Sequence, residues 1–251
     1  MEDKLKVHKV YIAVLTHNSW NITEQFLQLL YANTSPEAFR LLVLDNGSTD
    51  ETRNKLNEFA KDHSNVELIL SDSNLGVIDG RNTQIKHFLE SNSDDLFLML
   101  DNDQFVREGW LQQHVDFLMS GYDLIGVEAW QLGRTMLPVL KLQRPGAFFH
   151  YVGCGGMLLK REVVQKVGLF DDRYNPAYFE DPDYNFRIQD AGFKIGWNDQ
   201  SRITHVPHQT LGKMSQKEKN DVFVSSYHKF RAKWKDRVLQ QIINPYRKIS
   251  S

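Results

Sequence analysis

The chain has 251 residues, which is enough for one large domain or two small ones. Apolar residues make up 41% and charged residues 25%, so composition excludes a disordered chain. The 30 basic and 32 acidic side chains give a formal net charge of −2, and such a balance lacks the basic field that nucleic-acid binding uses. The single cysteine, Cys154, excludes an internal disulfide framework and a multi-cysteine zinc site.

The apolar run before His17 is only a few residues long, which is too short for the core of a secretory signal. No stretch of the chain approaches the ~18 apolar residues of a membrane-spanning helix. We therefore expect a protein without a transmembrane segment, located in the cytoplasm, with no nucleic-acid partner.

Continuous apolar runs alternate with stretches of helical length over the first hundred residues. The expected strands are Val10–Leu15, Leu41–Leu44, Val66–Leu70 and Leu96–Leu100. The expected helices are Asn21–Tyr31, Asp50–Lys61 and Asp79–Glu90, the second starting at a capping box of Ser48 and Glu51. This pattern predicts an α/β fold with a mostly parallel, Rossmann-like central sheet covered by helices.

The alternation weakens beyond Leu100. The spacing there predicts a helix over Glu108–Met119, strands at Asp123–Ala129 and Tyr151–Leu159, and short helices at Arg161–Val167 and after Asp181. Residues 132–149 show no clear pattern. Residues 215–247 read as a charged helix with one apolar face, formed by Phe223, Tyr227, Phe230 and Trp234. We divide the chain into a domain of residues 1–214 and a helical tail of residues 215–251 that packs on it.

Polar residues follow each of the four expected strands. They include Thr16, His17 and Asn18 after the first strand, Asp45 after the second, Asn74 and Gly76 after the third, and Asp101, Asn102 and Asp103 after the fourth. Turn preference explains any one such loop, but the carboxyl ends of parallel strands meet at one edge of a sheet, where ligands bind. The sequence therefore predicts a binding site at this edge.

Asp101 and Asp103 come directly after a strand that should be buried. Two carboxylates placed two residues apart on a rigid strand end can hold a hard cation such as Mg²⁺ or Mn²⁺. An EF-hand is excluded, because Val106 stands where its glycine is needed. The alternative is a polar turn ahead of the helix near Glu108.

A second acidic cluster contains Glu180, Asp181 and Asp183, with Pro182 suited to a first helical turn. One interpretation makes Asp181 the N-cap of that helix. The other makes it a general base, because a partly buried carboxylate near others has a raised pKa.

Two further groups are candidates for ligand contact. His205 or His208 could supply a metal ligand, although a hydrogen-bonded structural histidine is more common. Gly155 and Gly156 allow the backbone to approach a ligand closely.

Together these pieces resemble the ordered signature of family 2 glycosyltransferases with the GT-A fold. The resemblance is carried by the runs at 14–18, 44–50, 73–82 and 100–103, and then by those at 155–161, 168–171, 179–193 and 203–205. Each run by itself is weak evidence for the family, whereas the order and spacing of the runs together are specific to it. The resemblance covers residues 10–208 and divides the domain into a nucleotide-binding half, 1–103, and an acceptor half, 104–214.

The resemblance implies a role for each matching residue. Those expected around the nucleotide are Thr16, His17, Asn18, Asp45, Asn74, Gly76, Arg81, Asn82 and Asn102. Asp101, Asp103 and His205 are the implied contacts of Mn²⁺ or Mg²⁺, and Gly155 and Gly156 border the sugar and acceptor pocket. Asp181 is the implied base, with Glu180 beside it. His17 stands where the family often has tyrosine.

The resemblance implies an inverting, metal-dependent transfer from a nucleoside-diphosphate sugar to an acceptor hydroxyl. UDP is the first candidate for the donor nucleotide, followed by GDP and dTDP. The expected acceptor is a glycan, a lipid-linked group or a protein. One alternative is a sugar-phosphate nucleotidyltransferase, which the absence of a Gly-rich loop after the first strand disfavours. The other is a non-catalytic nucleotide- or carbohydrate-binding module, which intact acidic motifs disfavour.

Overall fold

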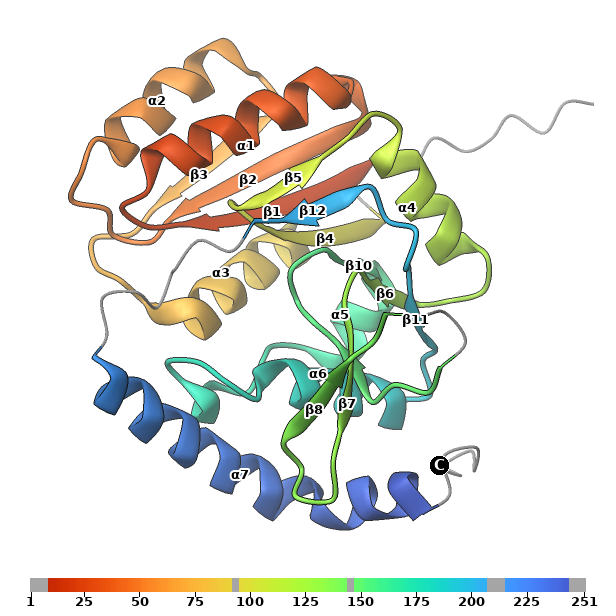
Figure 1. Cartoon of the computed structure of the whole chain (residues 1–251). Helices are drawn as coiled ribbons and strands as arrows, with labels where there is room; N and C mark the ends of the chain where they lie inside the picture. The colour runs from red at the N-terminus through yellow and green to blue at the C-terminus, as the bar shows by residue number, and fades with distance from the viewer. Residues whose placement is uncertain (1–8, 92–94, 144–146, 207–214, 244–251) are drawn as a thin grey trace, which may run out of the picture.

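The computed structural model describes residues 9–91, 95–143, 147–206 and 215–243, without the side chains of 241–243. Its centre is a seven-stranded sheet in the order β11-β6-β10-β4-β1-β2-β3, in which β10 alone runs antiparallel to its neighbours (Figure 1). The strands in chain order are β1 Val10–Thr16, β2 Phe39–Asp45, β3 Val66–Leu70, β4 Leu96–Asp101, β6 Leu124–Gly126, β10 Met157–Lys160 and β11 Ile195–Trp197. The mostly parallel sheet predicted from the apolar runs is confirmed.

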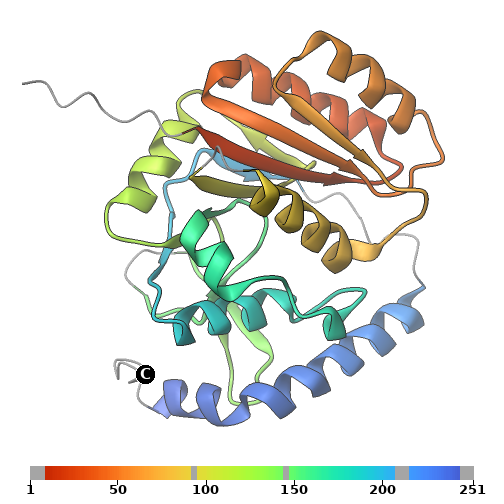
Figure 2. The same cartoon turned by 180° about the vertical axis from the view of Figure 1, so that it is seen from behind.

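Helices cover both faces of this sheet. They are α1 Trp20–Asn33, α2 Thr52–Asp62, α3 Gly76–Glu90, α4 Trp110–Met119, α5 Arg161–Val167, α6 Glu180–Asp190 and α7 Gln216–Ile243, with short 3-10 turns at Pro36–Ala38 and Asp172–Tyr174. Residues of α1, α2 and α4 pack into one core, and those of α3, α5, α6 and α7 into the other (Figures 1 and 2). Within the described ranges, no helix combines the length and apolar character needed to cross a bilayer.

The two cores explain why the first strand is apolar throughout. Val10, Ile12 and Val14 contribute to the core beneath α1, whereas Tyr11 and Ala13 face α3. Because successive side chains of a strand point to opposite faces, a strand buried on both sides needs an unbroken apolar run.

Strand register places the polar strand ends at one edge. Thr16 of β1 lies opposite Asp45 of β2, and Leu15 lies opposite Asp101 of β4. The chain then continues into β5, Gln104–Val106, which pairs antiparallel with β12, Ile203–His205. In that pairing His205 lies opposite Gln104, so a segment a hundred residues away in sequence completes this edge.

The structure corrects several predicted boundaries in the second half. The strand expected at Asp123–Ala129 is divided between β6 and β7, Ala129–Leu132. The strand expected at Tyr151–Leu159 is divided between β9, Tyr151–Val152, and β10. After β6 the chain leaves the large sheet for a three-stranded one, β8-β7-β9, whose β8 is Pro138–Lys141, and after β9 a glycine-containing turn returns it to the large sheet at β10.

The predicted capping box of α2 is wrong. The helix begins at Thr52, whose amide donates to the Asp50 carboxylate at 3.0 Å. The Ser48 hydroxyl instead accepts a hydrogen bond from the Asn18 amide at 2.9 Å. Ser48 thus joins two strand-end loops rather than starting the helix.

Candidate active site

Asp101, Asp103 and His205 gather at the end of β4. One ligand atom from each lies within 4.8 Å of the others, and the His205 Nε2 atom is 3.3 Å from Oδ1 of Asp103. Asp103 is buried, whereas the Asp101 side chain is 39% exposed toward the pocket. Two carboxylates and an imidazole form a donor set that suits Mn²⁺ or Mg²⁺ completed by phosphate oxygens or water, so the residues fit such an ion.

His205 is held between two carboxylates. The nearby carboxylate of Asp103, and then that of Glu128, favours the protonated ring and raises the pKa of His205 to about 10. The Nδ1 atom lies 3.8 Å from Oε1 of Glu128, which Lys141 contacts at 2.5 Å. The imidazole is therefore aimed at Asp103, and a divalent cation bound there would displace its proton.

Arg81 of α3 supports Asp101 from below. Its guanidinium is buried and donates to Asp101 Oδ1 at 2.5 Å, and to the carbonyls of Leu100 at 3.0 Å and Ala13 at 3.3 Å. These bonds fix the carboxylate at the ends of β1 and β4 and place a positive charge beside it.

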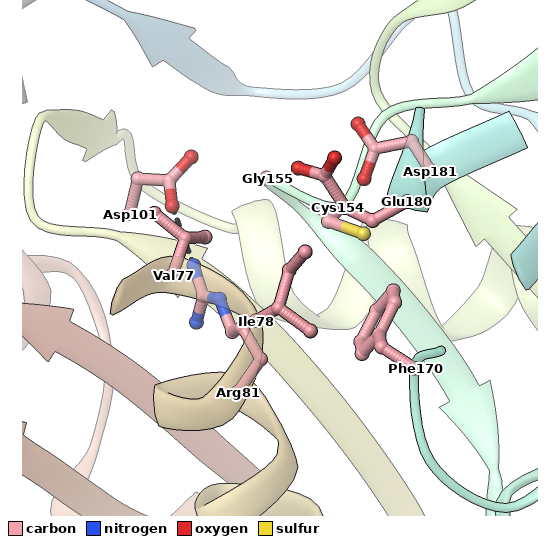
Figure 3. A pocket seen from close by; sticks show the side chains of 9 residues that line it. All are labelled: Val77, Ile78, Arg81, Asp101, Cys154, Gly155, Phe170, Glu180 and Asp181. Carbon is pink, nitrogen blue, oxygen red and sulfur yellow. Dashed lines mark hydrogen bonds and ion pairs between the residues drawn. The ribbon is translucent and has the colours of Figure 1, made fainter. Parts of the chain in front are cut away.

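A cavity of about 130 Å³ lies between Asp101 and the first turn of α6. Figure 3 shows Asp101 with Arg81 on one side of this pocket, and Glu180 and Asp181 on the other. The full lining consists of Val77, Ile78, Arg81, Asp101, Cys154, Gly155, Phe170, Glu180 and Asp181. The candidate metal residue and the candidate base therefore face one space.

Glu180 and Asp181 form an acidic pair on the far wall. Burial raises the pKa of both carboxyl groups, and repulsion from Asp181 raises that of Glu180 further. The thiol and amide of Cys154 donate to Asp181 and oppose part of the rise. A carboxylate with a raised pKa accepts a proton at neutral pH more readily than an ordinary one.

The alternative role for Asp181, as helix N-cap, is wrong. Helix α6 begins at Glu180, and the preceding residue, Phe179, makes no side-chain capping bond. Asp181 thus lies in the first turn, with its carboxylate on the pocket wall.

Gly155 fits only because it has no side chain. A Cβ atom there would lie 2.5 Å from Oδ2 of Asp101 and 2.8 Å from the Gln104 amide nitrogen. Gly156 follows with φ of +79°, in the left-handed region. The glycines bring the backbone between β9 and β10 against the acidic end of β4.

A neutral histidine supports this glycine turn. The His114 ring is 1% exposed, its Nε2 atom donates to the Gly156 carbonyl at 3.0 Å, and its Nδ1 atom accepts from Asn198 at 3.0 Å. Burial lowers the pKa of His114 to about 4.

This burial predicts a loss of stability in mild acid. Between pH 6.5 and 4 the unfolded chain protonates His114 and the folded chain does not, so unfolding takes up a proton. We expect His114 to contribute about 2 kcal/mol to the fall in unfolding free energy from pH 7 to pH 5. Urea unfolding at both values should show a smaller fall for His114→Gln, which keeps a donor for Gly156. An identical fall in the two proteins would contradict the assignment.

The loops after β1 and β2 interlock beside the pocket. Asp45 is fully buried and accepts from Arg53 Nε at 3.0 Å and from the Ser48 amide at 3.1 Å. The Asn18 side-chain oxygen accepts from the Thr49 amide at 2.6 Å. His17 lies next to Asn18, with its Nε2 atom 3.1 Å from the Asn18 amide nitrogen. These residues lie at the same sheet edge as Asp101 but do not line the cavity.

Several residues predicted to contact the nucleotide form hydrogen bonds within the protein instead. The Asn82 side chain pairs with the backbone of Phe170 in both directions, at 2.8 and 3.1 Å. Asn102 donates to the hydroxyls of Thr16 and Thr23. Asn74 accepts from Asn46 and from the Gly76 amide, which shapes the start of α3. Position 208 lies outside the described residues, so His208 is not placed.

Four supporting residues were not anticipated. They are Arg53 at Asp45, Gln104 at the Asp101 amide, His114 behind Gly156, and Glu128 beside His205. Arg53 and Gln104 act on residues eight and three positions away, whereas His114 and Glu128 act through contacts between segments far apart in sequence. Glu128, two residues beyond the end of β6, had a recognisable signal, because it is a polar strand end like the others.

A sequence model of the family described as Glycosyl transferase family 2 matches residues 11–133. Glycosyltransferase AglE of Haloferax volcanii is 29% identical over 119 residues, covering 47% of this chain and 38% of that protein. The succinoglycan biosynthesis protein ExoA of Rhizobium meliloti is 23% identical over 224 residues, covering 83% of this chain and 66% of the relative. The matches thus span less than two thirds of either relative's length.

Solved structures share the fold. GalNAc-T7 with UDP, GalNAc and Mn²⁺ has a TM-score of 0.75 at 15% identity, over 94% of this chain and 49% of that one. The mannosyltransferase PcManGT of Pyrobaculum calidifontis, in complex with GDP-Man and Mn²⁺, has a TM-score of 0.63 at 16% identity, over 80% and 58% of the two chains. Residues 11–133 thus match glycosyl transferase family 2, and the chain shares the GT-A fold of these structures.

Proposed function

We propose that the protein transfers a sugar from a nucleoside-diphosphate sugar to an acceptor hydroxyl, assisted by a divalent cation. One observation supports this most strongly: Asp101, beside Asp103 and His205, faces the Glu180–Asp181 pair across one cavity. Transfer needs charge stabilisation at a leaving diphosphate and proton removal from an acceptor hydroxyl. The two walls offer these two functions.

The nucleotide binds along the ends of β1, β2 and β4 in this proposal. Asp45 contacts the base, with Thr16, His17, Asn18, Asn74 and Gly76 around it, and Asn82 and Asn102 shaping the loops. Asp101, Asp103 and His205 hold Mn²⁺ or Mg²⁺, which supplies Lewis-acid stabilisation when bound. UDP is the first candidate nucleotide, with GDP and dTDP next; structural neighbours contain UDP or GDP-Man together with Mn²⁺.

The acceptor hydroxyl enters beside Gly155, Gly156 and Asp181. Asp181 takes its proton as the hydroxyl oxygen attacks the anomeric carbon on the face opposite the diphosphate. Burial, and then repulsion from Asp101, raises the pKa of Asp181 and so its basicity. A single displacement of this kind inverts the anomeric configuration, whereas retention would need a second carboxylate acting as nucleophile. The acceptor is a glycan, a lipid-linked group or a protein.

A thermal-shift panel tests the donor half of the proposal. We expect one of UDP-, GDP- or dTDP-sugar to raise the melting temperature by about 5–10 °C at 100 times its dissociation constant, and only with Mn²⁺ or Mg²⁺ present. The stabilising sugar is then incubated with acceptors, and released nucleoside diphosphate is measured.

Other results would redirect the assignment. Pyrophosphate formation from a nucleoside triphosphate and a sugar phosphate would indicate a nucleotidyltransferase. Donor stabilisation without nucleotide release on any acceptor class would favour a binding module. No shift with any nucleotide sugar, with or without metal, would contradict the proposal.

A further inference from the structure

Two consecutive non-glycine residues adopt left-handed backbone conformations directly before the acidic pair. Tyr178 has φ of +73° and Phe179 has φ of +67°, and Glu180 follows as the first residue of α6. Residues with a side chain disfavour this region, so two in succession persist only where the surroundings impose them. The direction of the first turn of α6 depends on this strained turn.

Helix α7 supplies the aromatic surroundings of the turn. The buried Phe179 ring lies 5.3 Å from Phe223, 5.8 Å from Tyr227 and 5.2 Å from Phe230, measured between ring centroids. Tyr178 packs edge-on against Phe223 at 5.4 Å. Most of the apolar face predicted for this helix therefore packs against the Tyr178–Phe179 turn.

Polar contacts from α7 hold both flanks of the turn. On one side, the buried Ser226 hydroxyl donates to the Ala177 carbonyl at 2.9 Å. On the other side, Asp183 in the first turn of α6 is fully buried. Its Oδ1 atom accepts from Trp234 Nε1 at 2.7 Å and lies 2.7 Å from Lys233 Nζ.

Asp183 also ties α6 to its other neighbours. Tyr174 donates to Oδ1 at 3.2 Å, and Arg187, one turn along α6, donates to Oδ2 at 2.9 Å. This many donors fix the orientation of the buried carboxylate, and removal of one leaves a buried acceptor without its partner. Tyr174 and Arg187 lie near Asp183 in sequence, whereas Trp234 and Lys233 reach it from α7.

We propose that α7 is a positioning element: it holds the Tyr178–Phe179 turn and Asp183, and thereby aims Glu180 and Asp181 into the pocket. Figure 1 shows α7 running past α6 on the side away from the large sheet, and none of its residues lines the cavity. The metal residues lie on or next to β4 and β12. Weakening the contacts of α7 should therefore displace the proposed base, Asp181, and leave the affinity for the nucleotide sugar unchanged. The measurement of kcat in its test rests on the proposed transferase activity.

The test compares the double variant Lys233→Met/Trp234→Phe with Lys235→Met. The double variant keeps side-chain bulk and removes two donors to Asp183, whereas Lys235 is exposed on the same helix. We expect kcat to fall about 10- to 100-fold in the double variant, with KM for the nucleotide sugar changed less than about 2-fold. Lys235→Met should match the wild type in both.

A rescue experiment separates positioning from general destabilisation. Tyr178→Gly removes the conformational cost of one left-handed position. Added to the double variant, it should restore kcat at least about 3-fold, because the turn then needs less support. A fall in kcat and donor affinity together, or no rescue, would show that α7 has a merely structural role.

A readout that needs no turnover keeps this inference distinct from the proposed activity. Cys154, the only cysteine of the chain, lines the cavity and donates to Asp181. If α6 shifts, 4,4′-dithiodipyridine should label Cys154 about 5-fold faster or more in the double variant, but not in Lys235→Met. Faster labelling in a protein that shows no transfer would leave the positioning role standing and refute the activity. Unchanged labelling and kcat in the double variant would overturn the positioning role.

Discussion

Asp181→Asn should abolish sugar transfer while leaving donor binding intact. Asparagine keeps the shape of the side chain but cannot accept the acceptor proton, so we expect kcat to fall about 10²- to 10⁴-fold. The metal cluster lies on the opposite wall, and the affinity for nucleoside diphosphate with Mn²⁺ should stay within about 2-fold of the wild type. Steady-state kinetics and calorimetric titration of the nucleotide measure the two quantities.

The same substitution should stabilise the protein at neutral pH. Burial raises the pKa of Asp181 above its unfolded value, so ionisation costs stability as pH rises through the folded pKa. Removing the charge should raise the unfolding free energy at pH 7.5 by ~1–2 kcal/mol, because solvent at the pocket wall screens part of the effect. In the melting temperature this corresponds to about 2–8 °C.

Glu180→Gln is the matched control for Asp181→Asn. The Glu180 carboxyl group lies on the same wall and also has a raised pKa, so the Glu180→Gln protein should be more stable than the wild type as well. It should retain much more activity, because Asp181 remains available as base. Full transfer by Asp181→Asn together with inactivity of Glu180→Gln would move the base to Glu180.

Asp103→Asn should remove metal binding and, with it, metal-dependent binding of the nucleotide. Loss of residues that merely orient metal ligands costs about 10- to 100-fold in affinity, and loss of a carboxylate ligand should cost at least about 100-fold. Isothermal titration with Mn²⁺ alone measures the direct effect. The shift in melting temperature with nucleoside diphosphate and Mn²⁺ measures the consequence.

The control for Asp103→Asn removes one negative charge elsewhere. Asp62 is exposed at the last residue of α2, so Asp62→Asn should leave both measurements unchanged. Chelation of the wild-type protein with EDTA should reproduce the Asp103→Asn result. Unchanged Mn²⁺ affinity in Asp103→Asn, or full activity in EDTA, would refute the metal assignment.

The local sequence by itself determined the first four strands, most of the helices and the polar strand ends. Residues 10–14 and 96–100 are buried on both faces, and only unbroken apolar runs satisfy such burial, so the sequence pattern identifies them directly. Because parallel strands share a carboxyl edge, the positions of Asp45 and Asp101 followed from strand order. The docking face of α7 followed equally from the spacing of Phe223, Tyr227, Phe230 and Trp234.

Only the tertiary structure decided which distant segments meet. The pairing of β5 with β12 brings His205 to Asp103, and the bonds of Asn185 to Val152 hold α6, with the acidic pair, opposite Asp101. The support of Asp183 by Trp234 spans 51 residues. Periodicity reports whether a segment is buried, but not against what. Contacts of this range depend on loop closure and side-chain fit across the whole core, which no local pattern encodes.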